Sequence, residues 1–515
     1  MLISDFRHRS SPAAARAPRG RQRAIAVIAA IALCVQPIAP TLAGLGAAHA
    51  QSLPDLGDES QTNLTPAQER KLGESVIRQI RASGGYMDDP EVNDYLNNLG
   101  HRLVAALPEA GQDFEFFAVP DGSINAFALP GGFIGVNTGL ILLAQNESEL
   151  ASVLAHEISH VTQHHLARMI SAQKGSLLMQ LAALAVAIAA ARSNSAGGSQ
   201  TASAAIAGAQ AAAIQTQLNF TREHEYEADR IGFQRLDAAG FDVTAMAALM
   251  ERLQRAGRFA DGTAPSYLRT HPITYQRIAE AQARAQGKPY RQTADSLDFH
   301  LVRALLRSYT GTAKEAVAGF DSAIAEHKYN NEIAAHYGLV ASLLRAADYP
   351  RAKAELATLE KLAPPDPMIA AMGAHVYLDA GDLDQAIARF ESALARYPNK
   401  KQLIYDYPDA LLAAKRTRDA VAFLERELLV YTSDGRLHGT AAKAYAALGN
   451  RMQQHRHQAE LYAWQGDHRG AVVQLELAVK AGDGDFYLAS VVESRLRALR
   501  RELLEQQRTG TTRHG

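Results

Sequence analysis

The stretch Leu150–Arg168, which reads LASVLAHEISHVTQHHLAR, places His156, Glu157 and His160 in the pattern H-E-x-x-H. Its apolar residues recur with the spacing of a buried helix, at Leu150, Val153, Leu154, Ile158 and Val161. Because residues i and i+4 lie on one face of a helix, both imidazoles can bind one metal ion, and Glu157 beside them can deprotonate a water molecule. The stretch therefore predicts a buried helix that carries two ligands of a zinc hydrolase.

A second acidic stretch further along the chain can supply the third ligand. Residues 221–232 read TREHEYEADRIG and are expected to form a helix. Zinc hydrolases commonly bind the metal through two histidines and one carboxylate, which leaves a fourth position for water. Glu223, Glu225 and Glu227 are all candidates, and their spacing does not separate them. Asp229, on the same helix, can orient a ligand histidine through its second ring nitrogen.

The segment that precedes the motif is predicted to form a small sheet. Residues 114–119 alternate as a strand does, and residues 124–137, INAFALPGGFIGVN, indicate strand, turn and strand. In many zinc peptidases the substrate backbone adds to a sheet edge beside the metal. We expect the second strand to be that substrate-binding edge, with an ordinary core hairpin as the alternative. The residues concerned are Gly132, Phe133, Ile134, Gly135 and Val136.

The first 50 residues have the features of a secretory signal peptide. Six arginines precede an apolar run at residues 24–35, and the run AHA at 48–50 provides small residues before a cleavage site. The alternative, a transmembrane anchor, would need about 20 apolar residues. Cys34, the only cysteine, lies in the segment that would be removed, so the mature chain would suit an oxidising compartment. Residues 51–63 are polar and are expected to form a flexible lead-in.

From residue 297 onward the sequence repeats. Alanines at 34-residue intervals are each followed four residues later by a larger apolar residue, and these pairs are Ala352 and Leu356, Ala386 and Phe390, and Ala420 and Leu424. This period is typical of tetratricopeptide repeats, which stack as helical hairpins and present a concave surface that usually binds peptides or proteins. The alternative is a plain helical array that only packs on the preceding domain.

Two further features near the motif allow more than one interpretation. The run at residues 176–191, SLLMQLAALAVAIAAA, is apolar on all sides but shorter than a membrane span. A hairpin that covers the active site or makes a peripheral contact with a membrane would explain it, and a buried helix pair is the alternative. His164 and His165 follow the motif too closely to share its face fully, so they are expected beside the ligands or at the surface.

The motifs together resemble a known family. The pattern H-E-x-x-H, then Glu225-x-x-x-Asp229, then His271 before a proline and Arg277, is similar to that of the HtpX and CAAX-prenyl-protease type of zinc peptidase. Within that family, the chain is most similar to the secreted BepA-like branch. The similarity lies in the segments NAFALPGG, NESELASVLAHEISHVTQHH and EADRIG, in the signal peptide and in the helical repeats. The resemblance covers about residues 60–480 and is most specific over the first half.

The resemblance implies a mostly α fold in two parts. A gluzincin-like zinc peptidase domain, built of helices and a small β-sheet, would occupy residues 64–290. An α-solenoid of tetratricopeptide repeats would occupy residues 297–500, and residues 501–515 are expected to be a disordered tail. The sequence lacks the long transmembrane helices of the membrane-embedded relatives, which argues against prenylated substrates.

The same resemblance implies roles for individual residues. One Zn²⁺ per chain would be bound by three side chains, His156, His160 and Glu225. The choice of Glu225 follows the family pattern, because it stands four residues before Asp229. Glu157 would be the general base, and Asp229 would orient a ligand. His271 would either donate to the oxyanion or occupy the open metal position. The alternative is a structural histidine before a proline turn.

The implied function is that of a periplasmic zinc metalloendopeptidase that hydrolyses misassembled outer-membrane proteins. Its repeats would bind protein substrates and the outer-membrane assembly machinery. The alternative is a repeat-based chaperone or adaptor for outer-membrane protein assembly with a largely latent protease, and the complete metal motif favours the enzyme. The formal net charge of −1 gives no support to nucleic-acid binding.

Overall fold

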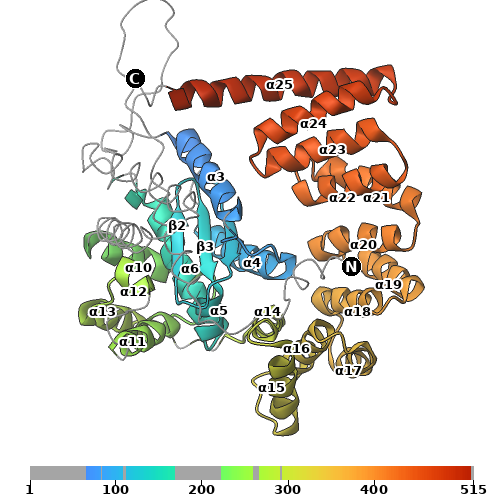
Figure 1. Ribbon diagram of the computed structural model, residues 1–515. Helices are drawn as coiled ribbons and strands as arrows, with labels where there is room; N and C mark the ends of the chain where they lie inside the picture. The colour runs from blue at the N-terminus through green and yellow to red at the C-terminus, as the bar shows by residue number, and fades with distance from the viewer. Residues whose placement is uncertain are drawn as a thin grey trace, which may run out of the picture. The chain divides into compact units, whose positions relative to one another are not determined.

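The computed structural model describes residues 65–82, 84–107, 112–166, 168, 222–258, 266–289, 291 and 293–511 (Figure 1). The chain divides into two compact units, an amino-terminal unit that ends at Phe299 and a repeat unit that begins at His300. The predicted signal peptide, the flexible lead-in and the apolar run at 176–191 lie outside the described residues. None of the helices within the described ranges is long and apolar enough to cross a membrane.

The amino-terminal unit arranges helices around a small sheet. Its first helix begins after Thr65, whose hydroxyl caps it by accepting a hydrogen bond from Gln68 N–H at 3.3 Å. The elements are, in chain order, α3 (Pro66–Ala82), α4 (Pro90–Ala106), β1 (Glu115–Val119), β2 (Ala126–Leu129), β3 (Phe133–Asn137), α5 (Thr138–Leu143), α6 (Glu147–Thr162), α10 (Arg222–Ala238), α11 (Thr244–Arg258), α12 (Ser266–Thr270) and α13 (Tyr275–Gln286).

The strands lie in the order β1-β3-β2, with β3 parallel to β1 and antiparallel to β2. The turn between β2 and β3 requires glycine, since Gly131 and Gly132 have φ values of 74° and 85°. The strand, turn and strand predicted over residues 124–137 are therefore confirmed.

The prediction that the segment Gly132–Val136 forms a sheet edge is wrong. β3 contains most of this segment and is the central strand, so its backbone N–H and C=O groups bond to β1 on one side and to β2 on the other. A substrate strand therefore cannot add to it. Within the described sheet β2 pairs on one side only, and it packs on α6, so the edge beside the motif helix belongs to β2.

Alternate residues of β1 face opposite sides of the sheet. Phe117 joins a hydrophobic cluster with Val76 and Ile80 of α3. Phe116 faces α4, where a Cβ on Gly100 would lie 2.3 Å from its ring. Because side chains alternate along a strand, α3 covers one face of the sheet and α4 the other. α6 packs against α4 and β2, which sets the motif helix beside the sheet.

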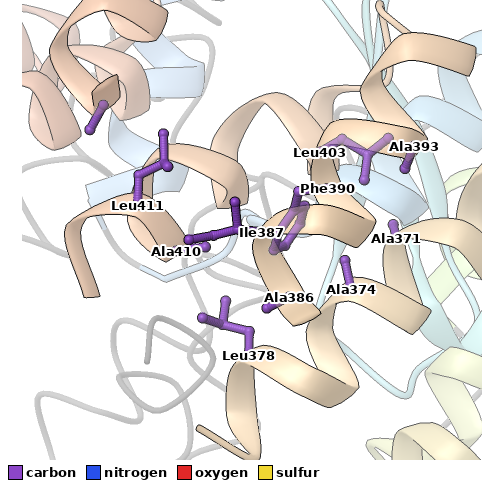
Figure 2. Close-up of a cluster of buried hydrophobic side chains, with 11 residues drawn as sticks. Ala371, Ala374, Leu378, Ala386, Ile387, Phe390, Ala393, Leu403, Ala410 and Leu411 are labelled. Carbon is purple, nitrogen blue, oxygen red and sulfur yellow. The ribbon is translucent and has the colours of Figure 1, made fainter. Parts of the chain in front are cut away.

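The repeat unit is a succession of helices in which, from α15 to α25, each packs on its neighbours in sequence. The alanines predicted to fill the helix contacts are fully buried, and their larger partners are at most 1% exposed. Figure 2 shows one such cluster, in which Ala386 and Phe390 meet side chains of the preceding and following helices. The helices are α14 (Leu297–Ser308), α15 (Ala313–Ala325), α16 (Glu332–Arg345), α17 (Tyr349–Leu362), α18 (Pro367–Asp379), α19 (Leu383–Arg396), α20 (Lys401–Ala413), α21 (Thr417–Val430), α22 (Gly435–Ala447), α23 (Arg451–Trp464), α24 (His468–Ala481) and α25 (Phe486–Thr511).

The carboxyl-terminal helix is longer than the sequence analysis predicts. A disordered tail is expected from residue 501, whereas α25 continues to Thr511. The physical reason is local, because residues 497–508 are rich in leucine, arginine, glutamate and glutamine, which have high helix propensity, and contain no glycine or proline. The segment from residue 501, whose polar composition suggests a disordered tail, therefore forms the end of α25.

Candidate metal centre

Helix α6 places the H-E-x-x-H residues in the interior of the amino-terminal unit. Asn146 caps the helix by accepting a hydrogen bond from Glu149 N–H at 2.9 Å. His156 and His160, one turn apart, bring their Nε2 atoms to 2.9 Å from each other. Both histidines are 2% exposed and Glu157 is fully buried. The predicted helix thus presents two ring nitrogens and a carboxyl group to one point.

Helix α10 brings Glu225 to these histidines. Its Oε1 lies 3.4 Å from His160 Nε2, and its Oε2 lies 3.6 Å from His156 Nε2. The approach depends on Gly232, because a Cβ at that position would lie 3.1–3.2 Å from backbone atoms of Ala155 and His156. A glycine therefore lets α10 cross α6 closely enough for a short carboxylate side chain to reach the imidazoles.

The structure separates the three glutamates that spacing left open. Glu223 is exposed. Glu227 lies away from the ring nitrogens that meet at the centre and contacts His165 and Arg168, at 3.1 and 2.9 Å. Of the three, Glu225 is the one whose carboxylate reaches the histidines of the motif.

His271 lies in the segment that follows α12, and its side chain reaches the same group of side chains. Its Nδ1 lies 3.0 Å from Glu225 Oε1 and 3.4 Å from His156 Nε2, and its Nε2 lies 3.5 Å from Glu157 Oε1. The ring is 1% exposed, and its backbone N–H donates to the Tyr267 carbonyl at 2.8 Å. The side chain is therefore held inside the group of candidate ligands.

These side chains fit a divalent metal ion. The ligand atoms of His156, His160, Glu225 and His271 all lie within 4.8 Å of one another. Atoms bound about 2.0–2.1 Å from a tetrahedral ion lie roughly 3.4 Å apart, and the contacts given above range from 2.9 to 3.6 Å. Both carboxylate oxygens of Glu157 are buried without a hydrogen-bond partner in the described part of the chain. Such burial is costly unless a further group meets them.

Asp229 and Arg277 support the candidate ligands from behind. Asp229 Oδ1 lies 2.9 Å from His156 Nδ1. The Arg277 guanidinium donates to both Asp229 oxygens, at 2.6 and 2.8 Å, and lies 2.6 Å from Glu225 Oε2. Burial alone would raise the pKa of Asp229, but the charge of Arg277 and the bond to His156 lower it. A buried arginine therefore keeps the buried Asp229 carboxylate ionised.

The pKa values of the two glutamates of the centre are shifted in opposite directions. Burial raises the pKa of Glu157, although the imidazoles of His271 and His156 act in the other direction. Burial would also raise the pKa of Glu225, but His271, His160 and His156 hold it well below its usual value. Glu225 is thus a stable carboxylate suited to binding a cation, whereas Glu157 holds a proton more readily.

His165 lies on the outer side of His160. Its Nδ1 is 2.8 Å from His160 Nδ1, its ring stacks on His224 with centroids 4.4 Å apart, and the residue is fully buried. Burial lowers its pKa to about 4. His164 is instead a turn residue with φ of 51° and is partly exposed.

Sequence reasoning missed two of these contacts. Arg277 entered only as part of the family pattern, without a role, and Glu227 only as a candidate ligand. The signal for Glu227 is its position between Glu225 and Asp229 on one helix. No spacing in the sequence indicates that Arg277 reaches α10, because the pairing joins residues 48 positions apart.

Comparison with known proteins agrees with this geometry. Peptidase family M48 matches residues 90–285, and the tetratricopeptide repeat family matches residues 377–444. The beta-barrel assembly-enhancing protease of Escherichia coli is 33% identical over 444 residues, which cover 84% of this chain and 88% of the relative. A Vibrio cholerae protein whose name contains the same words is 35% identical over 455 residues, covering 85% and 90%.

A more distant relative matches about half of the chain. The mitochondrial metalloendopeptidase OMA1 of Schizosaccharomyces pombe is 28% identical over 249 residues, which cover 47% of this chain and 68% of the relative. The M48 match spans the helices and strands that build the metal centre, and this family implies a bound metal. The chain therefore belongs to the M48 metallopeptidases, in the group of the beta-barrel assembly-enhancing proteases, and is a metalloprotease.

Proposed function

We propose that the chain is a zinc endopeptidase of the periplasm that cleaves outer-membrane β-barrel proteins whose assembly has failed. One observation carries the proposal, the meeting of three donors suited to zinc with a buried glutamate. The names of the relatives support the substrate class, since these proteases are named for enhancing β-barrel assembly. The expected signal peptide supports the compartment.

The chemistry follows from the positions of the side chains. We assign the ligand role to His156, His160 and Glu225. When bound, zinc polarises the scissile carbonyl and lowers the pKa of water. Glu157 accepts the proton of the attacking water and passes it to the leaving amine. Its raised pKa favours this role, because a carboxylate of higher proton affinity is a stronger base.

The edge strand β2 is the proposed binding site for the substrate backbone. It pairs on one side only within the described sheet and packs on α6. Main-chain hydrogen bonds to a sheet edge give affinity without reading the sequence. This mode suits a protease of β-barrel proteins, because an unassembled barrel exposes unpaired strands. We therefore assign substrate binding to β2 in place of the predicted segment Gly132–Val136, which lies mainly in β3.

His271 is the proposed fourth ligand of a resting site. Its Nδ1 has the same spacing to Glu225 and His156 as the ligand atoms have to one another. Substrate must then displace this ring to bring its carbonyl to the metal, which would limit cleavage of assembled proteins. The alternative role, donation to the oxyanion, would instead require the ring to stay while substrate binds.

Replacement of Glu157 tests the enzyme. Glu157→Gln should keep bound zinc and lose casein cleavage by about 10²–10⁴-fold, the usual contribution of a general base. Zinc is measured by elemental analysis of the purified protein and cleavage by release of labelled peptides. Glu251→Gln, a change of a glutamate on α11 outside the centre, is the control and should leave both unchanged. Cleavage that survives in Glu157→Gln, or in wild type after chelation, would refute the assignment.

Replacement of His271 tests the resting site. His271→Ala should cleave casein faster than wild type if the ring blocks the metal, because substrate no longer competes with it. The rate is measured at equal zinc occupancy, so that a change in metal content is not mistaken for a change in rate. A slower rate at full occupancy would instead favour the oxyanion role.

A repeat-based chaperone is the function that must be distinguished. The complete donor set favours the protease. An unassembled β-barrel precursor should be degraded by wild type and should persist with Glu157→Gln. Equal protection of the precursor by both proteins would support the chaperone, with the repeats as the binding surface.

A further inference from the structure

A second layer of side chains lies behind His160 and is not part of the ligand set. It consists of His165, Glu227 and Arg168, arranged outward from the metal centre. His165 Nδ1 faces His160 Nδ1 at 2.8 Å, His165 Nε2 faces Glu227 Oε2 at 3.1 Å, and Arg168 donates to the same oxygen at 2.9 Å.

We propose that His165 is a positioning residue that fixes the ring of His160 for metal binding. Glu227 in turn sets the tautomer of His165. The inference rests on the proposed zinc site and deepens it, since it assigns a function to residues outside the ligand set. A residue that acts in this way touches neither the metal nor the substrate.

The distances determine where the protons lie. A carboxylate accepts hydrogen bonds and does not donate them, so His165 must present an N–H at Nε2 to Glu227. In a neutral imidazole the other nitrogen is then an acceptor, and His165 Nδ1 can accept the Nδ1–H of His160. His160 is thereby held with its lone pair on Nε2, the atom that faces His156 and Glu225.

The two ligand histidines are therefore held by different kinds of partner. His156 Nδ1 faces the carboxylate of Asp229 at 2.9 Å, whereas His160 Nδ1 faces an imidazole. Both partners fix ring orientation and tautomer, which is the usual function of groups behind a metal ligand. His165 is fully buried, so water cannot take its place as acceptor without a change in packing.

The test compares two substitutions of nearly equal shape. His165→Asn keeps an acceptor oxygen close to the position of Nδ1, and His165→Leu has the same branching without the acceptor. Zinc affinity is measured by competition with a chelator on the full chain, and the melting temperature of the metal-free protein is measured in parallel. His165→Leu should bind zinc about 10–100-fold more weakly than wild type. His165→Asn should stay much closer to wild type.

The outcomes separate this inference from the proposed function. Equal zinc affinity in His165→Leu and His165→Asn would overturn the positioning role, whether both match wild type or both are weakened. A loss in His165→Leu that exceeds the loss in His165→Asn at similar metal-free melting temperatures would support it. A wild-type protein that binds no zinc would refute the proposed function itself.

Glu227 provides the second pair if His165→Leu does not fold. Glu227 is partly exposed, so its replacement should leave the fold intact. Glu227→Gln keeps an acceptor for His165 Nε2–H, whereas Glu227→Leu removes it and frees the tautomer. Zinc affinity should fall more in Glu227→Leu than in Glu227→Gln. Equal affinities in this pair would show that Glu227 does not set the tautomer.

Discussion

At the scale of single residues, Arg277 is the group on which the charge balance of the centre depends. It is 3% exposed and contacts both Asp229 and Glu225. These contacts raise its pKa against the effect of burial. Without Arg277, the carboxylates of Asp229 and Glu225 would either remain charged at a large desolvation cost or take up a proton.

Arg277→Met is therefore expected to destabilise the metal-free protein by roughly 3–5 kcal/mol, the usual cost of removing one partner of a buried ion pair. The measurement is thermal unfolding of the chelator-treated protein, followed by circular dichroism. Arg284→Met is the matched control on α13, because Arg284 is partly exposed and pairs with Glu280 one turn away. A control variant as unstable as Arg277→Met would show that the loss comes from α13 and not from the buried carboxylates.

At the scale of elements, the crossing of α6 and α10 decides whether the centre forms. Both helices are specified locally, but their separation is set at Gly232, where the backbone of α6 leaves room for no larger residue without adjustment. Glycine in a helix normally costs about 0.5–1 kcal/mol relative to alanine. At Gly232 the close approach outweighs this propensity.

Gly232→Ala should therefore lower both stability and zinc affinity, because α10 must move away from α6 and take Glu225 with it. Chelator competition and thermal unfolding measure the two effects. Gly319→Ala in α15 is the control, since a Cβ there would meet no atom within 4 Å, and it should stabilise by about 0.5–1 kcal/mol. If Gly232→Ala also stabilised the protein without loss of zinc, the close crossing would not limit the site.

At the scale of the whole molecule, buried histidines in the repeat unit make stability depend on pH. His438 and His457 bring their Nδ1 atoms to 2.8 Å and are 7% and 4% exposed. Burial lowers the pKa of both histidines, and the neighbouring His438 ring lowers the pKa of His457 further. The pair is therefore neutral in the folded state at a pH where it is protonated in the unfolded state.

The sign of the effect follows from proton linkage. Below about pH 6.5, the usual pKa of histidine, the unfolded chain binds more protons than the folded chain. The free energy of unfolding should be insensitive to the pair above that pH and should fall as the pH decreases, by up to about 1.4 kcal/mol per pH unit for each histidine.

Urea unfolding between about pH 7.5 and 5 measures this dependence, with the fluorescence of Trp464 in α23, the only tryptophan, as the reporter. The double substitution His438→Leu and His457→Leu should flatten the dependence. His455→Gln, a change of a partly exposed histidine on the same helix, should leave it unchanged. A slope that persists in the double variant would assign the effect to other groups.

Elements with local signals can be predicted from the amino-acid sequence alone. The helical spacing around His156 and His160, the turn between the two strands at 124–137 and the 34-residue alanine period all predict structures that the chain forms. These features depend on residues a few positions apart, or on a repeat of one contact. Backbone geometry and the burial of apolar residues are sufficient to specify them.

Which distant segments meet depends on how the whole chain folds. It brings Glu225, and neither Glu223 nor Glu227, to the histidines of the motif, makes β3 the central strand, and places His165 and Arg277 behind the candidate ligands. At the centre, His271 contacts Glu225 and His156, which lie 46 and 115 positions away in the sequence. No periodicity spans such intervals, because these pairings depend on how whole helices pack and on where a glycine allows them to approach.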